Sequence, residues 1–274
     1  MLGQDVVRVL DEAGESVTAT DREELDILDA AALRSTVAGH DVLVNCAAWT
    51  AVDDAESDEA GAFALNATAA QLLARATREA GARFVHVSTD YVFDGRGTSP
   101  YREDAPIAPR SAYGRTKAAG EWAIRAEAPD HLIVRTAWLY GAGGRCFPRT
   151  IAGLARTRGA LQVVDDQVGQ PTWTEDLARL IVRLVEADAP AGTYHGTSSG
   201  QTSWFGFARA VVESAGLDPE IVAPSQSVHS DRAAERPAYS VLSHAALEAL
   251  GVAPIGPWDE AWQRSHAAVL ADLG

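Results

Sequence analysis

Cysteine is scarce in this 274-residue chain, which has only Cys46 and Cys146. One stands beside an expected strand and the other in an expected loop, which gives neither a disulfide framework nor a metal-ligand spacing. We therefore expect both to be free thiols. The seven histidines show no i, i+4 pairing and no adjacent carboxylate cluster, so no catalytic metal is expected.

Positive charge and long apolar runs are also lacking. Lys and Arg number 23 against 38 Asp and Glu, which gives a net charge of -15. Because Lys and Arg supply most of the binding to nucleic-acid phosphates, no nucleic acid partner is expected. No stretch approaches the ~20 apolar residues of a membrane span, and the N-terminus lacks a basic region followed by an apolar run. We expect a cytoplasmic protein without a membrane partner.

Short apolar runs alternate with amphipathic helical stretches up to about residue 190. This alternation predicts an α/β fold with a doubly wound parallel sheet of Rossmann type. The expected helices are 4–13, 30–38, 59–80, 112–127 and 174–187, and the expected strands are 16–20, 42–46, 83–89, 131–137 and 161–164. Beyond residue 190, frequent Gly and Pro predict a smaller C-terminal domain that closes over a cleft.

One segment carries most of the chemical information. Thr89 is expected at the end of the buried strand 83–89, where open α/β sheets bind ligands. Tyr113 and Lys117 are expected on one face of the next helix, so that the ammonium would lower the pKa of the phenol from its usual ~10. Tyr113 would then be an acid near neutral pH. Thr89, Tyr113 and Lys117 together predict a hydride-transfer site.

Further motifs are spread over almost the whole chain: Leu25-Asp26-Ile27 with Asp29, Val44 to Ala48, Ala51-Val52-Asp53 with Ala55-Glu56, Asn66-Ala67, Ser88 to Gly95, Tyr113 to Lys117 with Gly120-Glu121, Arg135 to Trp138, Gln170-Pro171-Thr172 and Arg236-Pro237. In these residues the chain resembles the reductive branch of the extended short-chain dehydrogenase/reductases, specifically the dTDP-4-dehydrorhamnose reductase family. Tyr91 stands where related sugar-nucleotide dehydratases have Glu, which disfavours a 4,6-dehydratase.

The resemblance implies an NAD(P)H-dependent oxidoreductase that reduces the C4 ketone of dTDP-4-dehydro-6-deoxy-L-mannose to dTDP-L-rhamnose. Tyr113 would donate a proton to the developing alkoxide, and Lys117 would hold the nicotinamide ribose. Thr89 would hydrogen-bond the carbonyl oxygen, a contact that strengthens in the transition state.

The resemblance also implies contacts for substrate and cofactor. On the substrate side, besides Thr89, these are Asp90, Tyr91, Trp138 and Arg236, the last at the pyrophosphate. On the cofactor side, besides Tyr113 and Lys117, they are Gly3, Asp21, Arg22, Asp26, Ile27, Ala47 and Ala48. A rim or core position for Trp138, a surface salt bridge for Arg236 and simple packing for the two alanines are open alternatives.

The nicotinamide preference is open on the sequence. Asp21 suits a free ribose 2′-hydroxyl and Arg22 a 2′-phosphate, so the cofactor is expected to be NADPH or NADH. We predict an NAD(P)-binding Rossmann-type domain over 1–145, to which 160–188 return, and a substrate-binding lid domain mainly over 190–274. The expected partner is a dTDP-linked 4-keto-6-deoxysugar, and the resemblance allows a homodimer.

The start of the chain departs from the family pattern. A buried first strand and a loop ending in Gly-Gln-Leu-Gly are expected there, and only the last glycine, Gly3, has a counterpart. The missing strand would pair on both sides, between 16–20 and 42–46. We hypothesise that the natural protein begins about ten residues upstream, and that without this loop the cofactor pyrophosphate is bound more weakly.

Two other functions compete with this interpretation. One is a related dTDP-4-keto-deoxysugar reductase of an antibiotic pathway, such as a dihydrostreptose-type synthase, which would use the same core residues. The other is a non-catalytic regulatory subunit similar to the methionine adenosyltransferase beta subunit. Thr89, Tyr113 and Lys117 favour catalysis.

Overall fold

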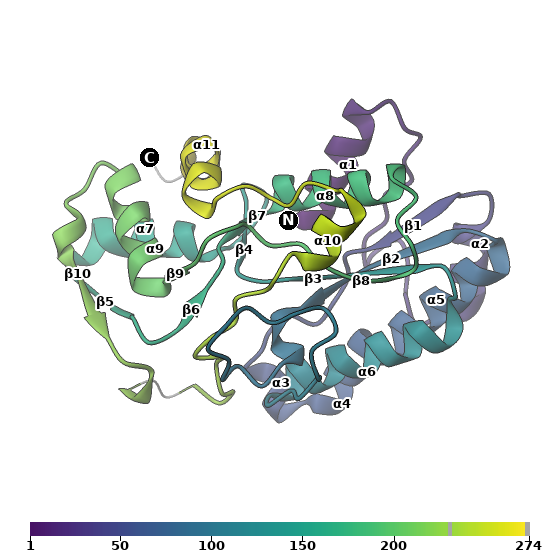
Figure 1. Ribbon diagram of the computed structural model, residues 1–274, viewed down its shortest axis with the longest axis horizontal. Coiled ribbons are helices and arrows are strands. Elements are labelled where there is room, and N and C mark those ends of the chain that lie inside the picture. Colours follow the sequence, from purple (N-terminus) through teal and green to yellow (C-terminus); the bar gives the residue numbers. More distant parts are fainter. Residues whose placement is uncertain (230–231, 272–274) are drawn as a thin grey trace.

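A parallel sheet forms the centre of the computed structural model, which describes residues 1–229 and 232–271 (Figure 1). Its described strands follow the order β1-β2-β3-β8. They are β1 (Val42–Asn45), β2 (Arg83–Thr89), β3 (His131–Thr136) and β8 (Gly192–His195). Each adjacent pair runs parallel. With helices on both faces, this sheet confirms the predicted α/β class.

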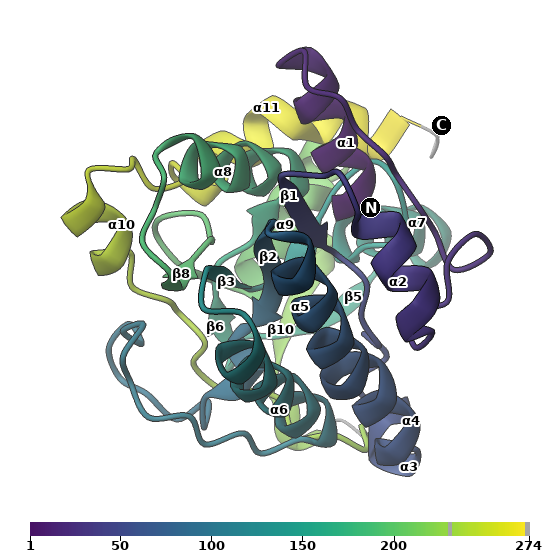
Figure 2. The ribbon, with the colours of Figure 1, turned by 90° about the vertical axis from the view of Figure 1, so that its right-hand side faces the viewer.

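Successive residues of β2 serve opposite faces of the sheet. Val85 packs with α1 and α8, whereas Phe84 packs with α2, α5 and α6. These helices are α1 (Leu2–Glu12), α8 (Thr174–Glu186), α2 (Ala30–Val37), α5 (Ala69–Ala80) and α6 (Ala112–Glu127). Figure 2 shows α2, α5 and α6 on one face and α1 with α8 on the other.

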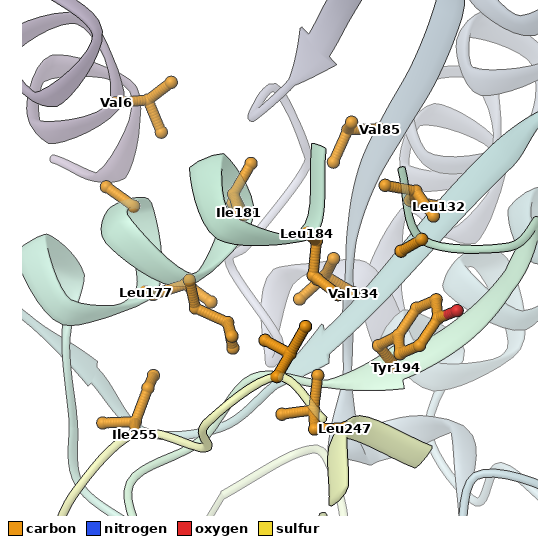
Figure 3. Packing of buried hydrophobic residues seen from close by; sticks show 14 of the residues in the cluster. Val6, Val85, Leu132, Val134, Leu177, Ile181, Leu184, Tyr194, Leu247 and Ile255 are labelled. Atoms are coloured by element: carbon orange, nitrogen blue, oxygen red, sulfur yellow. The ribbon is translucent and has the colours of Figure 1, made fainter. Parts of the chain in front are cut away.

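The core beneath α8 is built from aliphatic side chains. Figure 3 shows Leu177, Ile181 and Leu184 of α8 directed toward Val85 and Val134 of the sheet. All five are at most 1% exposed, and burial of one such side chain stabilises the fold by about 1.5–3 kcal/mol. This packing fixes β2 and β3, whose carboxyl ends carry the candidate site.

Local signals define the ends of the elements nearest the site. Ser111 caps α6, because its Oγ accepts the Gly114 N–H at 3.1 Å. Gly81 ends α5 with a φ of 71°, which glycine adopts without strain. The predicted strand 83–89 and helix 112–127 are confirmed at both boundaries.

A smaller lobe lies at the left of Figure 1. Helices α7 (Phe147–Arg158), α9 (Trp204–Ser214) and α11 (Trp258–Leu270) surround a core that contains Tyr140, Phe207 and Trp262. Its strand pairs are β5 (Leu161–Val164) with β10 (Val222–Ser225), β4 (Leu139–Tyr140) with β7 (Thr172–Trp173), and β6 (Val168–Gly169) with β9 (Thr202–Ser203). The shorter helices of the chain are α3 (Asp54–Ser57), α4 (Glu59–Phe63), α10 (Ala245–Leu250), the π-helix η1 (Ala64–Thr68) and the 3₁₀ turns η2 (Asp90–Val92), η3 (Pro219–Ile221) and η4 (Ser227–His229).

Three expectations from the sequence require correction. The predicted strand 16–20 is wrong: this segment forms no strand, is mostly exposed, and is tied by a 2.9 Å contact between Thr18 Oγ1 and His40 Nε2. Among the described strands only β2 pairs with β1, so 16–20 has no ladder to join. The predicted strand 161–164 exists but pairs with β10 instead of the central sheet. The predicted helix 59–80 is divided into α4, η1 and α5.

Candidate active site

The site lies where β2 and β3 end, with Thr89 and Thr136 opposite each other in register. Beyond Thr89 the chain enters η2, and Thr89 Oγ1 accepts the Tyr91 N–H at 3.2 Å. Tyr113 occupies the first turn of α6 and shares a hydrogen bond with Thr89. The sheet and the helix thus bring two predicted catalytic hydroxyls together in a buried position.

The acidity of Tyr113 differs from the sequence-based expectation. Burial raises the pKa of Tyr113 to about 12; the hydrogen bond with Thr89 lowers this pKa and the charge of Asp90 raises it. The prediction that Lys117 lowers the phenol's pKa is therefore wrong for the protein without ligands. A buried phenol loses more solvation on ionisation than these neighbours restore.

Lys117 is directed toward β2 instead of toward the phenol. Its Nζ donates to the Val87 carbonyl at 2.7 Å and lies 3.0 Å from His86 Nε2. The side chain is 1% exposed, and burial lowers the pKa of Lys117 to about 8. The lysine therefore changes charge near neutral pH.

Asp90 and Tyr91 lie beside the hydroxyl pair. Burial raises the pKa of Asp90 to about 6, against hydrogen bonds from Thr89 and Ser240. The Tyr91 ring meets the Tyr113 ring edge-on, with centroids 5.4 Å apart. The two predicted substrate residues thus form the wall next to Tyr113.

Two glycines of α6 allow the helix to lie close to its neighbours. A Cβ at Gly114 would stand 2.3 Å from the Tyr91 carbonyl oxygen, and one at Gly120 would stand 2.2 Å from the Asn66 carbonyl oxygen. Both approaches are too close for any side chain. These glycines set the distance between Tyr113 and the end of β2.

A buried ion pair connects α6 to β2 and β3 next to the site. Arg135 Nε and Nη2 each donate to the Glu121 carboxylate at 2.8 Å. Glu121 Oε1 also accepts the Ser88 hydroxyl at 2.7 Å, one residue before Thr89. The guanidinium, hydrogen-bonded to a buried carboxylate, holds the pKa of Glu121 below its usual range although burial opposes this.

Trp138 connects the site to the smaller lobe. Its ring stacks on Trp204 with centroids 3.5 Å apart and planes 5° apart. A Cβ at Gly169 would stand 2.5 Å from the Trp138 ring, so glycine leaves room for it. Trp138 has a φ of 50°, which is unusual for a bulky residue and identifies it as a strained position.

Arg236 is engaged by a carboxylate in this structure. Its Nη1 and Nη2 donate to Asp53 Oδ1 and Oδ2 at 3.0 and 2.6 Å. Asp53 Oδ1 also accepts the Ala234 N–H at 3.0 Å. The pair joins the loop after β1 to the segment around residue 236. This segment lies near Tyr91. Burial raises the pKa of Tyr91, and the Arg236 charge offsets part of that rise.

Three of the remaining predicted cofactor residues, Gly3, Ala47 and Ala48, lie in or beside the loop that follows β1. A Cβ at Gly3 would stand 3.7 Å from Cys46 Cβ, so the first turn of α1 lies beside the loop that follows β1. Ala47 is exposed in this loop and Ala48 is partly buried. Small residues between a helix start and the Lys117 cluster fit a nicotinamide dinucleotide, which needs close approach to the backbone.

The other four predicted cofactor residues lie between α1 and α2. Asp21 and Asp26 close turns, because their Oδ1 atoms accept the N–H groups of residues 23 and 28 at 2.8 and 2.9 Å. Ile27 packs against the α2 and α5 cluster, and Arg22 is exposed. These positions leave the choice between NADH and NADPH open.

Potential metal ligands do not cluster in the described parts of the chain. Within 1–229 and 232–271 no group of three or more His, Cys, Asp or Glu is arranged to hold a metal ion. Both cysteines are free, as expected. In the same residues no helix has the length and apolarity needed to cross a membrane.

The sequence analysis did not identify two polar residues of β1 and β2 that lie next to Lys117. Asn45 and His86 are buried at neighbouring positions of β1 and β2, with Asn45 Nδ2 3.1 Å from His86 Nδ1. Their appearance inside two apolar strand runs was the available signal. Asn66, one of the residues that carry the family resemblance, accepts the Trp49 N–H at 2.9 Å and donates to the Trp49 carbonyl at 3.1 Å and to Thr116 Oγ1 at 3.0 Å.

Comparison with known proteins identifies a family for this chain. The family model of the RmlD substrate binding domain matches residues 1–270. The chain belongs to this family. It is 48% identical to the dTDP-4-dehydrorhamnose reductase of Streptomyces griseus, over 100% of this chain and 92% of that protein. The predicted family resemblance is thereby confirmed.

Two further relatives of this RmlD family member bear on its chemistry. The dTDP-4-keto-6-deoxy-D-glucose reductase of Streptomyces niveus is 46% identical, over 99% of this chain and 95% of that protein. The structure of a Bacillus anthracis dTDP-4-dehydrorhamnose reductase in complex with NADP superimposes with a TM-score of 0.92 at 34% identity, covering 96% of this chain and 94% of that one.

Proposed function

We propose that this RmlD family member reduces the C4 ketone of dTDP-4-dehydro-6-deoxy-L-mannose to dTDP-L-rhamnose, with NADPH or NADH as the reductant. The observation that carries the proposal is the buried hydrogen-bonded pair of Thr89 and Tyr113 beside Lys117. Two hydroxyl donors in a dry site suit a carbonyl oxygen that gains negative charge. The similarity to the Streptomyces griseus reductase supports the same substrate.

The chain's own residues would manage the proton. When bound, the nicotinamide supplies the hydride. The raised pKa of Tyr113 keeps its proton in place at neutral pH, so the phenol can donate it to the alkoxide as that charge develops. Lys117, with a pKa of about 8, can stabilise the resulting tyrosinate as the ammonium. Thr89 would turn its hydroxyl from Asp90 to the substrate oxygen, and such a donor lowers a barrier by about 3–4 kcal/mol.

The substrate's diphosphate is proposed to engage Arg236. Because the guanidinium already holds one bidentate carboxylate, the phosphate oxygens would replace Asp53 on the same two nitrogens. Trp138, held flat by Trp204, would offer a ring face to the sugar. Asp90 and Tyr91 would contact the sugar beside Tyr113.

The division of labour follows the two lobes. We propose that 1–145 bind the cofactor, with α8 of the returning segment 160–188 covering the sheet, and that 190–274 mainly bind the substrate. Residues 192–195 are the exception, since β8 lies in the central sheet. The cytoplasmic location and the homodimer remain predictions.

The direct test is loss of NADPH absorbance on addition of dTDP-4-dehydro-6-deoxy-L-mannose. We expect turnover that falls by about 10²–10⁴-fold in Tyr113→Phe, because the variant keeps the ring but has no proton to donate. Equal turnover in both proteins would overturn the assignment of Tyr113. A folded wild type without turnover would favour the non-catalytic alternative.

A second candidate substrate is favoured by a specific relative. The Streptomyces niveus protein is named for dTDP-4-keto-6-deoxy-D-glucose. Both sugars are therefore compared by kcat/KM, each with NADPH and with NADH. A higher value for the glucose-configured sugar would assign the protein to the antibiotic-type reductases, with the same catalytic residues.

A further inference from the structure

A chain of hydrogen bonds runs from the loop after β1 to Lys117. The Ala47 N–H donates to Asn45 Oδ1 at 3.0 Å. Asn45 Nδ2 lies 3.1 Å from His86 Nδ1, and His86 Nε2 lies 3.0 Å from Lys117 Nζ. Asn45 and His86 face each other because they are in register on adjacent parallel strands. The side chains of Asn45, His86 and Lys117 are buried, so each donor among them must face an acceptor.

The order of donors along this chain is fixed at its outer end. A backbone N–H only donates, so the Asn45 atom facing Ala47 is the amide oxygen and the atom facing His86 is the NH₂ group. His86 Nδ1 must then accept, and a neutral imidazole carries its proton on Nε2. That proton points at Lys117 Nζ. An ammonium has no lone pair to receive it, whereas a neutral amine does.

We propose that His86 is a positioning residue that couples the charge of Lys117 to the orientation of the Asn45 amide. With Lys117 as the amine, His86 donates from Nε2. When Nζ takes up one proton from solvent, Nε2 must accept, so the ring proton moves to Nδ1. Asn45 must then turn its oxygen to Nδ1, which breaks its bond with the Ala47 N–H. An acceptor supplied to Ala47 by a ligand would favour this second state.

The other titratable side chains that interact with Lys117 keep their charge. The Cys46 thiol interacts electrostatically with Lys117, and burial raises the pKa of Cys46 to about 12. Glu121 lies one turn along α6 from Lys117, and its carboxylate is held by Arg135. Burial and the Lys117 charge keep the pKa of His86 well below its ordinary value, so the ring stays neutral.

The composition of the chain makes this coupling measurable. Lys117 is the only lysine in the sequence, so protein labelled with ¹³Cε-lysine gives one lysine signal. Protein labelled with ¹⁵N-histidine reports the tautomer of each ring. Between pH 6 and 10 we expect the lysine signal to titrate with a midpoint of about 8. The ¹⁵N chemical shifts of His86 Nδ1 and Nε2 should change with the same midpoint. At low pH Nδ1 should show the shift of a protonated nitrogen, and at high pH Nε2 should show it.

His195 is the matched control. It is also buried, and its Nδ1 lies 2.9 Å from the Ser243 carbonyl, which can only accept. His195 should remain the Nδ1–H tautomer throughout. The His86 signals are identified by their loss in His86→Gln, or by contacts to the Phe84 ring, 6.0 Å away between centroids, if that variant does not fold. A His86 tautomer that stays constant while Lys117 titrates would overturn the proposal.

Asn45→Asp provides an isosteric second test. Its two oxygens can accept from Ala47 and from His86 Nδ1 at once, so the ring should stay Nδ1–H at every pH and the lysine midpoint should rise. An unchanged exchange of tautomers in this variant would contradict the coupling. These measurements use the protein without substrate, so they succeed or fail independently of the proposed reductase activity. Only an effect of the coupling on catalysis rests on the role proposed for Lys117 in the reductase reaction.

Discussion

Arg135 and Lys117 are two buried cations with opposite surroundings. Each is 1% exposed. Arg135 meets the Glu121 carboxylate through two 2.8 Å hydrogen bonds, whereas Lys117 meets an imidazole nitrogen and a carbonyl oxygen, neither of which carries a negative charge. A buried charge with a carboxylate partner stays ionised, while one held only by dipoles loses its proton more easily. The first arrangement supports the sheet, and the second provides a group that can change charge.

The two cations compete for one carboxylate. Glu121 follows Lys117 by one helical turn, a spacing at which the two side chains are neighbours. Its oxygens nevertheless go to Arg135, Arg125 and Ser88. Fork-shaped guanidinium groups bind a carboxylate through two parallel bonds, which an ammonium cannot do. The sheet residue therefore takes the partner that the helix spacing alone would assign to Lys117.

The largest expected effect comes from removing the unpaired cation. Lys117→Met should reduce kcat by about 10²–10⁴-fold, because the ammonium that stabilises tyrosinate is lost while the buried stem is kept. Steady-state oxidation of NADPH measures this, with circular dichroism to confirm the fold. A Lys117→Met variant that keeps most of the wild-type kcat would show that the charge of Lys117 does not contribute to catalysis.

Breaking the paired cation should act on stability. Glu121→Gln leaves Arg135 buried without a countercharge, and we expect the free energy of unfolding to fall by about 3–5 kcal/mol. Urea denaturation at pH 7 gives the value. The double variant Glu121→Gln with Arg135→Met should recover part of this loss. A double variant less stable than the single one would show that Arg135 contributes through contacts other than the ion pair.

The pH dependence of stability should separate the two cations further. The folded pKa of Lys117 is about 8, below its ordinary 10.5. Between these values the unfolded chain binds more protons, so this group makes wild-type stability rise with pH. At pH 7 the buried charge of Lys117 therefore destabilises the wild type, whereas the two hydrogen bonds of its ammonium stabilise it. We expect the free energy of unfolding of Lys117→Met at pH 7 to exceed that of the wild type by about 1–2 kcal/mol, the balance of these two effects.

This gap should narrow as the pH rises from 8 toward 10.5. Urea denaturation of both proteins at pH 7, 9 and 10.5 measures it, and the difference between the proteins cancels the titration of other groups. A gap that is constant over this range would mean that burial does not lower the pKa of Lys117.

The smallest expected effect sharpens the comparison at the surface. Arg125 also contacts Glu121, at 3.0 Å, but its side chain is 33% exposed. Arg125→Ala should lower the free energy of unfolding by less than about 1 kcal/mol, and salt should reduce the difference. Denaturation at low and high ionic strength checks this. If Arg125→Ala lowered the free energy of unfolding as much as Glu121→Gln does, Arg125 instead of Arg135 would be the residue that stabilises β3.

Elements with a complete local signal were predictable. The apolar run before Thr89 and the Ser111 cap before Tyr113 give β2 and α6 at their observed boundaries. Elements that need a distant partner were not. The segment 16–20 has a strand-like composition but no described ladder to join, and 161–164 forms a strand whose partner, β10, is about sixty residues away.

The sequence by itself determined the fold class, the family and the meeting of Thr89 with Tyr113, because periodicity, caps and motif spacing act locally. Only the tertiary structure decided which charges meet. It directed Lys117 to His86 and Val87, raised the pKa of Tyr113, and joined Arg236 to Asp53 across 183 residues of sequence. The physical reason is that solvation and hydrogen-bond partners depend on burial, and burial is set by residues far apart in the sequence.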